Sequence, residues 1–246
     1  FAGVNRANYI LEFQDKIDFS GKDQIIAQAR FLRAYYYFEL IKWFGDVPLA
    51  VDQRLLFGDQ FNVDRTPRAE VYAQIEQDLI FAAETLPATQ TEEGRITSGA
   101  ARALLGKAYL YQDKFTEAAS ALDQVIAGPY DLVDDYSTIF ELEGENNIES
   151  VFEVQYTDKE GAGFGCLQCS EGNVAVGFNG IRNYSGPLFD SGFSFNVPVQ
   201  EAYDAFEPGD MRRDIAILNI EEFAAANGAT YNEGYEHTGF YNRKYI

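Results

Sequence analysis

Apolar side chains in the first half of the chain recur every three or four residues, which is the repeat of an α-helix. Between residues 23 and 44 this spacing places one set on a single helical face, namely Ile25, Ala29, Leu32, Tyr36, Leu40 and Trp43. Gly45 can adopt the left-handed backbone that ends a helix, and Pro48 cannot continue one. The pattern therefore predicts a helix that ends near Phe44.

A second amphipathic helix is predicted after Thr66 and Pro67, where a hydroxyl cap precedes a proline at the first helical position. Its apolar face comprises Val71, Ile75, Leu79, Ala82 and Leu86. A helical hairpin follows, in which we expect Ser98 to cap the first helix and Thr116 to cap the second.

Six positions of this hairpin have nearly the spacing of a tetratricopeptide unit: Leu105, Gly106, Tyr109, Ala118, Leu122 and Pro129. In such a unit small residues let two antiparallel helices approach closely, and neighbouring helices must cover the face that one unit cannot bury alone. The spacing predicts a short solenoid of stacked helices. A generic helical hairpin is the alternative interpretation.

The pattern changes after Tyr130. Residues 150–156 alternate apolar and polar side chains, which predicts a short half-buried strand. Residues 161–195 are rich in Gly, Asn, Ser and Phe without a sustained period, and such irregular segments often carry binding residues. The predicted fold is mostly α, with tetratricopeptide-like helical repeats packed against an irregular, loop-rich part with a few short strands.

Composition narrows the classes of function. Hydrophobic residues make up 46% of the 246 positions, so a folded core is expected. The 39 acidic and 19 basic residues give a formal charge of −20, which would repel nucleic acid and anionic lipid. This charge is also explained by solubility alone. We expect no cofactor and no metal, and no apolar run reaches the roughly 20 residues that span a bilayer.

Four stretches of the chain stand out: residues 4–8 (VNRAN), residues 28–49 (QARFLRAYYYFELIKWFGDVPL), the repeat hairpin continued by residues 130–132 and 147–155, and residues 195–213, which run from FNVP to FEPGDMRR. In this order they resemble the SusD/RagB family of Bacteroidetes surface lipoproteins. Two departures stand out: Met211 replaces a proline that is usual in the family, and residues 222–227 form an insertion.

The resemblance implies one SusD-like domain over residues 1–246, with a helical repeat layer at 1–130 and an irregular ligand-binding part at 131–246. It implies a protein that is not an enzyme and that lies on the outer-membrane surface. There it would capture oligosaccharides, or sometimes peptides, for a TonB-dependent transporter of the SusC type. The lipid anchor would lie upstream of Phe1, and both termini are expected to be truncated.

Candidate ligand-binding residues lie in the irregular segment, where aromatic rings alternate with amide and guanidinium groups that can reach sugar hydroxyls. They are Phe164, Phe178, Asn179, Arg182, Tyr184 and Phe189. The alternative is a loop that packs its own aromatic side chains. We assign the Tyr35, Tyr36, Tyr37 and Trp43 rings to packing, and any exposed members of this group to contact with the partner barrel.

Cys166 and Cys169 form the one cysteine pair of the chain. In an oxidising exterior location they can close a small disulfide. Two free thiols are the second interpretation, and a metal site is the third, because the single histidine, His237, supplies at most one further ligand of this type.

Two other classes of function stay open on the sequence. A glycoside hydrolase also needs aromatic platforms, together with two carboxylates across the scissile bond, but no acidic pair stands out here. A tetratricopeptide-type scaffold would grip a partner protein. A hydrolase predicts cleaved product, a scaffold predicts no affinity for small ligands, and a capture protein predicts binding without turnover.

Overall fold

The computed structural model describes residues 1–51, 53–56, 58–59, 63–156 and 175–245. The chain divides into two compact units. Unit 1 comprises Phe1–Leu132 and Ile148–Glu153, and unit 2 comprises Val133–Asn147 and Val154–Ile246. Each unit has a hydrophobic core of its own, and each is described by itself below.

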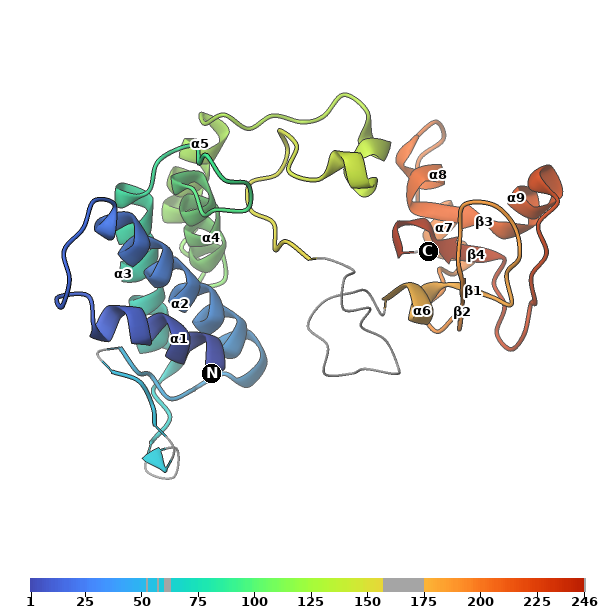
Figure 1. Cartoon of the computed structure of the whole chain (residues 1–246). Coiled ribbons are helices and arrows are strands. Elements are labelled where there is room, and N and C mark those ends of the chain that lie inside the picture. Colours follow the sequence, from blue (N-terminus) through green and yellow to red (C-terminus); the bar gives the residue numbers. More distant parts are fainter. Residues whose placement is uncertain (52, 57, 60–62, 157–174, 246) are drawn as a thin grey trace. The chain divides into compact units, whose positions relative to one another are not determined.

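Unit 1 is a stack of helices. Its members are α1 (Ala2–Glu12), α2 (Lys22–Phe44), α3 (Arg68–Thr85), α4 (Ser98–Leu110) and α5 (Phe115–Ile126). Each helix packs mainly against the next one along the chain, as Figure 1 shows for α1 to α5. This arrangement is the short solenoid that the sequence predicts. At the α4–α5 seam, Gly106 lies so close to Leu122 that a methyl group there would be 2.7 Å from its Cγ atom.

The face of α2 that is buried differs from the predicted one. The predicted stripe includes Tyr36 and Trp43, but both are exposed, Trp43 to 77%. Instead Phe31, Tyr37 and Phe38 are fully buried. The prediction was wrong because α2 contacts both α1 and α3, so two of its faces are covered. A prediction that assumes one apolar stripe then picks residues at the boundary between the two buried faces.

Helix ends agree with the sequence at α2 and differ elsewhere. Gly45 ends α2 with a positive φ of 67°. The cap of α4 is Thr97 rather than Ser98, since its hydroxyl accepts from the Ala100 N–H. Among the described residues, no side chain caps α5, and Thr116 lies inside this helix. At α3, the Asp46 carboxylate accepts from the Arg68 N–H at 2.8 Å, so a distant acidic residue replaces the predicted Thr66 cap.

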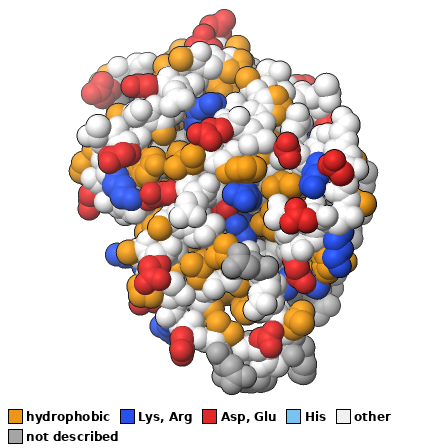
Figure 2. Space-filling view, turned by 90° about the vertical axis from the view of Figure 1, so that its left-hand side faces the viewer, with side chains coloured by type: hydrophobic (Ala, Val, Ile, Leu, Met, Phe, Trp, Pro, Cys, Tyr) orange, Lys and Arg blue, Asp and Glu red, His pale blue; other side chains and the backbone are white. Residues whose placement is uncertain are grey.

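Figure 2 shows the face of the molecule that lies on the left of Figure 1. Acidic and basic side chains alternate there with hydrophobic ones, so the large negative charge of the chain does not gather into one acidic area on this face. Among the described residues, no helix has both the length and the apolar character required to cross a bilayer.

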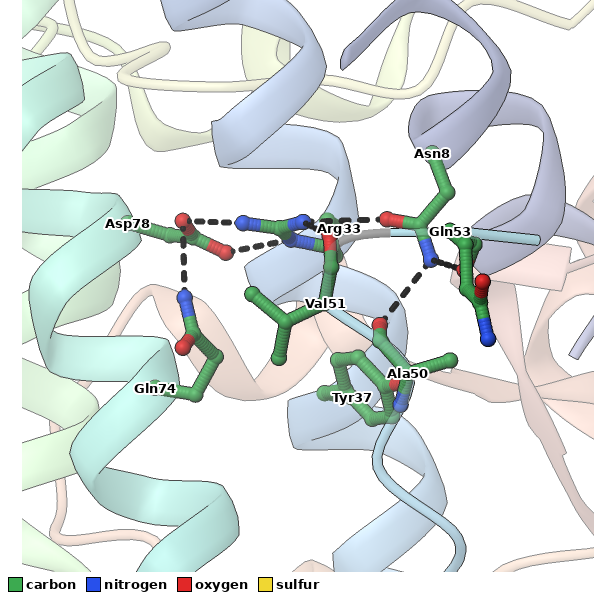
Figure 3. Close-up of polar contacts among 8 residues, drawn as sticks. All are labelled: Asn8, Arg33, Tyr37, Ala50, Val51, Gln53, Gln74 and Asp78. Carbon is green, nitrogen blue, oxygen red and sulfur yellow. Dashed lines mark hydrogen bonds and ion pairs between the residues drawn. The ribbon is translucent and has the colours of Figure 1, made fainter. Parts of the chain in front are cut away.

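A buried polar network crosses the helical stack of unit 1 (Figure 3). Its centre is Arg33 on α2, whose side chain is 3% exposed. The guanidinium donates from Nε and Nη2 to both carboxylate oxygens of Asp78 on α3, each at 2.7 Å. Its Nη1 donates to the Asn8 side chain at 3.0 Å and to the Val51 carbonyl at 2.7 Å. Every arm of the buried charge therefore has a partner.

The same network holds the segment after α2 against α1. Asn8 donates to the Ala50 and Gln53 carbonyls, and the Tyr37 hydroxyl accepts from the Ala50 N–H at 2.7 Å. Nearer the chain start, the Asn5 side chain exchanges two hydrogen bonds with the Leu55 backbone. Side chains of α1 and α2 thus substitute for a strand partner along this extended segment.

Unit 2 consists of short elements. They are the 3₁₀ turns Tyr136–Phe140 and Leu142–Gly144, α6 (Ala175–Asn179), β1 (Ile181–Arg182), β2 (Ser191–Gly192), α7 (Gln200–Asp204), α8 (Arg212–Ala216), β3 (Ile217–Asn219), α9 (Ile220–Asn227), β4 (Phe240–Asn242) and the 3₁₀ turn Arg243–Tyr245. β1 pairs with β2 in parallel, and β3 pairs with β4 antiparallel. The core is built on Ile181, Tyr184, Leu218, Ile220 and Tyr241.

Two segments of the second half bear on the sequence prediction. The strand expected at residues 150–156 does not form, and Phe152 instead packs edge-to-face on Phe31 at 5.1 Å between ring centroids, in the core of unit 1. The apolar and polar alternation at residues 150–156 therefore reflects the packing of the Phe152 ring and not a strand. The insertion at residues 222–227 forms most of α9, which Asn219 caps at its start and Gly228 ends with a φ of 65°.

Candidate ligand-binding site

Three phenylalanine rings lie together on the surface of unit 2. Phe193 and Phe195 are stacked, with centroids 5.5 Å apart and an interplanar angle of 21°. Phe178, at the end of α6, lies 5.9 Å from Phe195 in a tilted arrangement. Their side chains are 36% (Phe178), 47% (Phe193) and 67% (Phe195) exposed. We call these residues the phenylalanine cluster.

Backbone hydrogen bonds fix the cluster to α6. The Phe193 N–H donates to the Gly177 carbonyl at 2.8 Å, and the Phe195 N–H donates to the Phe178 carbonyl at 2.8 Å. Gly192 allows this close approach, because a methyl group on it would lie 2.5 Å from Gly180 Cα. The rings therefore sit on a short, directly hydrogen-bonded framework in which α6, β1 and β2 adjoin (Figure 1).

Ser194 explains why both neighbouring rings point outward. It has a φ of 55°, and its hydroxyl lies 3.1 Å from the Tyr241 hydroxyl in the core of unit 2. Its Oγ also donates to the Gly180 carbonyl at 3.2 Å. Ser194 therefore points into the core from a left-handed backbone, while the rings of Phe193 and Phe195 on either side of it stay exposed.

Arg182 holds the backbone that carries the phenylalanine cluster. Its Nε donates to the Phe193 carbonyl at 3.2 Å, and its Nη1 donates to the Glu233 and Tyr235 carbonyls at 3.0 and 2.8 Å. Gly234, with a φ of 65°, lets the loop wrap around the guanidinium, since a methyl group there would be 2.3 Å from Nη1. The guanidinium thus donates three hydrogen bonds to backbone carbonyls and connects two loops.

The structure separates the other candidate residues. Tyr184 is 8% exposed, its hydroxyl donates to the Pro187 carbonyl at 2.6 Å, and burial raises the pKa of its phenol. Asn179 is buried as well. Phe189 is partly buried and contacts the rings of Tyr184 and Phe223. Of the six candidates, Phe178 therefore lies in an exposed ring cluster.

Three predicted positions, Phe164, Cys166 and Cys169, lie outside the described residues. Phe193 and Phe195 are not among the residues predicted from the sequence, although both are exposed members of the cluster. Their signal in the sequence is the Phe-Ser-Phe spacing, which brings two rings close together along the chain. Whether the two rings share a face depends on the backbone between them, and Ser194 has a left-handed φ of 55°.

The cluster offers a ligand flat apolar faces at the surface. Aromatic faces pack against the C–H groups of a pyranose ring and gain more than buried area alone. Arg182, which the sequence analysis assigned to direct hydroxyl contact, instead donates three hydrogen bonds to backbone carbonyls. The geometry suits stacking of a sugar on rings whose positions are set before the ligand arrives.

Known proteins share this architecture. Residues 1–110 match a SusD-like family model described as starch-binding associating with outer membrane. SusD-like protein P2 of Formosa agariphila is 27% identical over 221 residues, which are 87% of this chain and 41% of that protein. A laminarin-binding SusD-like protein of known structure aligns with a TM-score of 0.86 and 36% identity, over 100% of this chain and 57% of that one.

A second solved structure is surface glycan-binding protein A from Bacteroides thetaiotaomicron in complex with laminarihexaose. It aligns with a TM-score of 0.81 and 26% identity, over 100% of this chain and 55% of that one. The chain thus spans about half the length of these two solved relatives. Both alignments extend over both units, which confirms the predicted mostly helical fold with its tetratricopeptide-like layer. The chain is thus similar to SusD-like proteins over its full length.

Proposed function

We propose that this protein binds glycans at the outer-membrane surface and delivers them to a TonB-dependent transporter of the SusC type. The observation that carries the proposal is the phenylalanine cluster, exposed and fixed by backbone hydrogen bonds. Solved relatives named for laminarin binding or seen with laminarihexaose support a glucan as the ligand. In this proposal a lipid anchor outside the given sequence holds the protein to the membrane.

The site residues of the proposal are the three rings together with Arg182 as a positioning residue. Phe178 keeps its predicted role in ligand contact, and Phe193 and Phe195 join it. Tyr184 and Asn179 act through the core, because their side chains are buried. The proposed role is capture without chemistry, so a bound glycan should be released intact.

The test is calorimetric titration with laminarihexaose of the wild type and of Phe193→Ala and Phe195→Ala variants. Each substitution should weaken binding by about 0.5–1.5 kcal/mol, which is the range for a specific aromatic contact. Trp43→Ala is the matched control, because Trp43 is an exposed aromatic residue on unit 1 and should leave the affinity unchanged.

Unchanged affinity in both ring variants would contradict this site, and cleaved hexaose after the titration would favour a hydrolase.

The proposed delivery to a transporter is tested separately by co-purification of the two proteins. Trp43 and the neighbouring Phe44 are exposed at the end of α2, and their aromatic faces suit protein contact. We expect Trp43→Ala to reduce co-purification while glycan affinity persists.

A further inference from the structure

A separate cavity lies in unit 2 between the 3₁₀ turn Tyr136–Phe140, the loop at Phe189 and the 3₁₀ turn Arg243–Tyr245. Its volume is about 190 Å³. At roughly 30 Å³ for each molecule of liquid water, this is room for about six waters, or for one small polar ligand. The lining includes Ser137, Phe140, Glu141, Phe189, Arg243 and Lys244.

Two of the lining residues are cations without a carboxylate partner among the described residues. Lys244 donates from Nζ to the Tyr136 hydroxyl at 3.1 Å, and its ammonium lies 4.3 Å from the centre of the Phe140 ring. Arg243 donates from Nη1 to the Asp214 backbone carbonyl at 3.0 Å. Neutral contacts thus hold both side chains in place and leave donors of each group available.

The neighbouring arginines differ from these two cations. Arg212 pairs with Asp210 at 2.6 Å, and Arg213 pairs with Asp214 at 2.8 Å, so both arginines of α8 are neutralised locally. The nearby Asp135 carboxylate accepts from the N–H and hydroxyl of Ser137, and these hydrogen bonds lower its pKa. In a chain of formal charge −20, two adjacent cations without an ion pair outnumber the one carboxylate, Glu141, that lines this cavity.

The remaining walls select among anions. The Phe140 and Phe189 rings are apolar, and a pyranose ring can pack against such surfaces. The Glu141 carboxylate and the Ser137 hydroxyl can accept hydrogen bonds from sugar hydroxyls. The cavity therefore combines one cationic end, aromatic surface and two hydroxyl-binding groups.

We propose that this cavity binds one carboxylated sugar unit, a uronic acid, with Arg243 and Lys244 holding the carboxylate. The inference rests on the proposed glycan-binding role and names a second site, distinct from the phenylalanine cluster, that selects charged sugars. Charge-assisted hydrogen bonds to the carboxylate supply the affinity, and the rings orient the pyranose.

The probe is methyl β-D-glucuronide, titrated calorimetrically into the protein, with methyl β-D-glucoside as the neutral control of the same shape. We expect binding of the glucuronide and none of the glucoside at equal concentration. Arg243→Gln and Lys244→Gln should each weaken glucuronide binding by at least about tenfold, as expected for a lost hydrogen bond to a charged group. Raising the salt concentration should also weaken it.

Glu141→Gln is the decisive companion variant, because it removes the negative charge that faces the same cavity. It should strengthen glucuronide binding a few-fold, opposite in direction to the two cation variants, so a general loss of folding cannot imitate the pattern. Thermal unfolding of each variant verifies that the fold is kept.

Several results would overturn the inference. They are equal binding of glucoside and glucuronide, wild-type affinity in both cation variants, no heat with the glucuronide, or inorganic sulfate binding as tightly as the glucuronide. The last result would mean that the cavity takes a bare anion. Laminarihexaose binding depends on the phenylalanine cluster and should be unchanged in all cavity variants, so failure here and failure of the proposed function are distinguishable.

Discussion

Arg33 shows at the scale of one residue how unit 1 tolerates a charge in its interior. The guanidinium is desolvated, which costs free energy unless the charge is paired and its donors are satisfied. Asp78 neutralises it, and Asn8 and the Val51 carbonyl use its remaining contacts (Figure 3). The network therefore joins α1, α2, α3 and the segment after α2 through hydrogen bonds.

We expect Arg33→Met to lower the free energy of unfolding by about 3–5 kcal/mol, because Asp78 would stay buried without its counter-charge. Denaturant titration measures this loss. The control is Lys42→Met, which breaks the surface pair with Glu39 and should cost less than about 1 kcal/mol. Equal losses in the two variants would show that the buried pair contributes no more to the free energy of unfolding than the surface pair.

Tyr37 gives a second prediction, which concerns alkaline pH. Burial raises the pKa of its phenol above the ordinary 10.0. Below pH 10 the phenol is protonated in both states, and its stabilising contribution is fully present. Above that value the unfolded chain ionises first, so the contribution is lost as pH rises toward the folded pKa.

At neutral pH, Tyr37→Phe should lower stability by about 1–3 kcal/mol, since the Ala50 N–H loses its acceptor. The stability gap between the wild type and this variant should then stay constant up to pH 10 and shrink above it. Urea titrations at several pH values measure the gap. A gap that widens above pH 10 would contradict the assigned direction of the pKa shift.

At the scale of elements, close backbone approach positions the proposed ligand site. Regular structure in this part of unit 2 is short, with two residues each in β1 and β2. Its geometry depends on Gly192, Ser194 and Arg182, each of which joins segments that are distant along the chain. A local pattern of hydrophobic residues carries no information about such contacts.

We expect Gly192→Ala to lower the unfolding midpoint of unit 2 and to weaken laminarihexaose binding, because its new methyl group would meet the Gly180 and Gly177 backbones at 2.5 and 2.8 Å. Gly177→Ala is the matched control. It lies in α6, and its methyl group would meet only the Phe193 ring, at 4.0 Å. Thermal unfolding followed by calorimetric titration compares the two, and equal behaviour would refute the packing argument.

At the scale of the whole molecule, each of the two units has a main core of its own among the described residues. The core of unit 1 centres on Phe31, Tyr37 and Phe38, whereas that of unit 2 contains Ile181, Ile220 and Tyr241. Since the two sets share no residue, a change within one core should act first on that core. The prediction that both units form one SusD-like domain stays a prediction.

We expect differential scanning calorimetry to resolve two unfolding transitions. Arg33→Met should lower the midpoint of one transition and leave the other in place, because Arg33 contacts residues of unit 1 alone among those described. A single transition that shifts as a whole in this variant would show that the two cores unfold together.

The sequence by itself determined the helical repeat layer and its order. Periodic apolar residues, the Gly45 stop and the small residues of the hairpin act over a few positions, so local spacing was sufficient to predict them. The family resemblance rested on the same kind of contiguous pattern. The α3 cap was missed because Asp46 lies 22 residues before the Arg68 N–H that it accepts from, whereas at α4 the predicted cap was one residue away from Thr97.

Only the tertiary structure decided which aromatic rings are exposed and which are buried. Phe178 and Tyr184 look equivalent in the sequence, but the fold exposes the first and buries the second. Likewise Arg182 holds loops, whereas Arg243 lines a cavity beside Lys244. Burial and charge balance depend on residues that lie far apart along the chain, and contacts of this kind form only when the whole unit has folded.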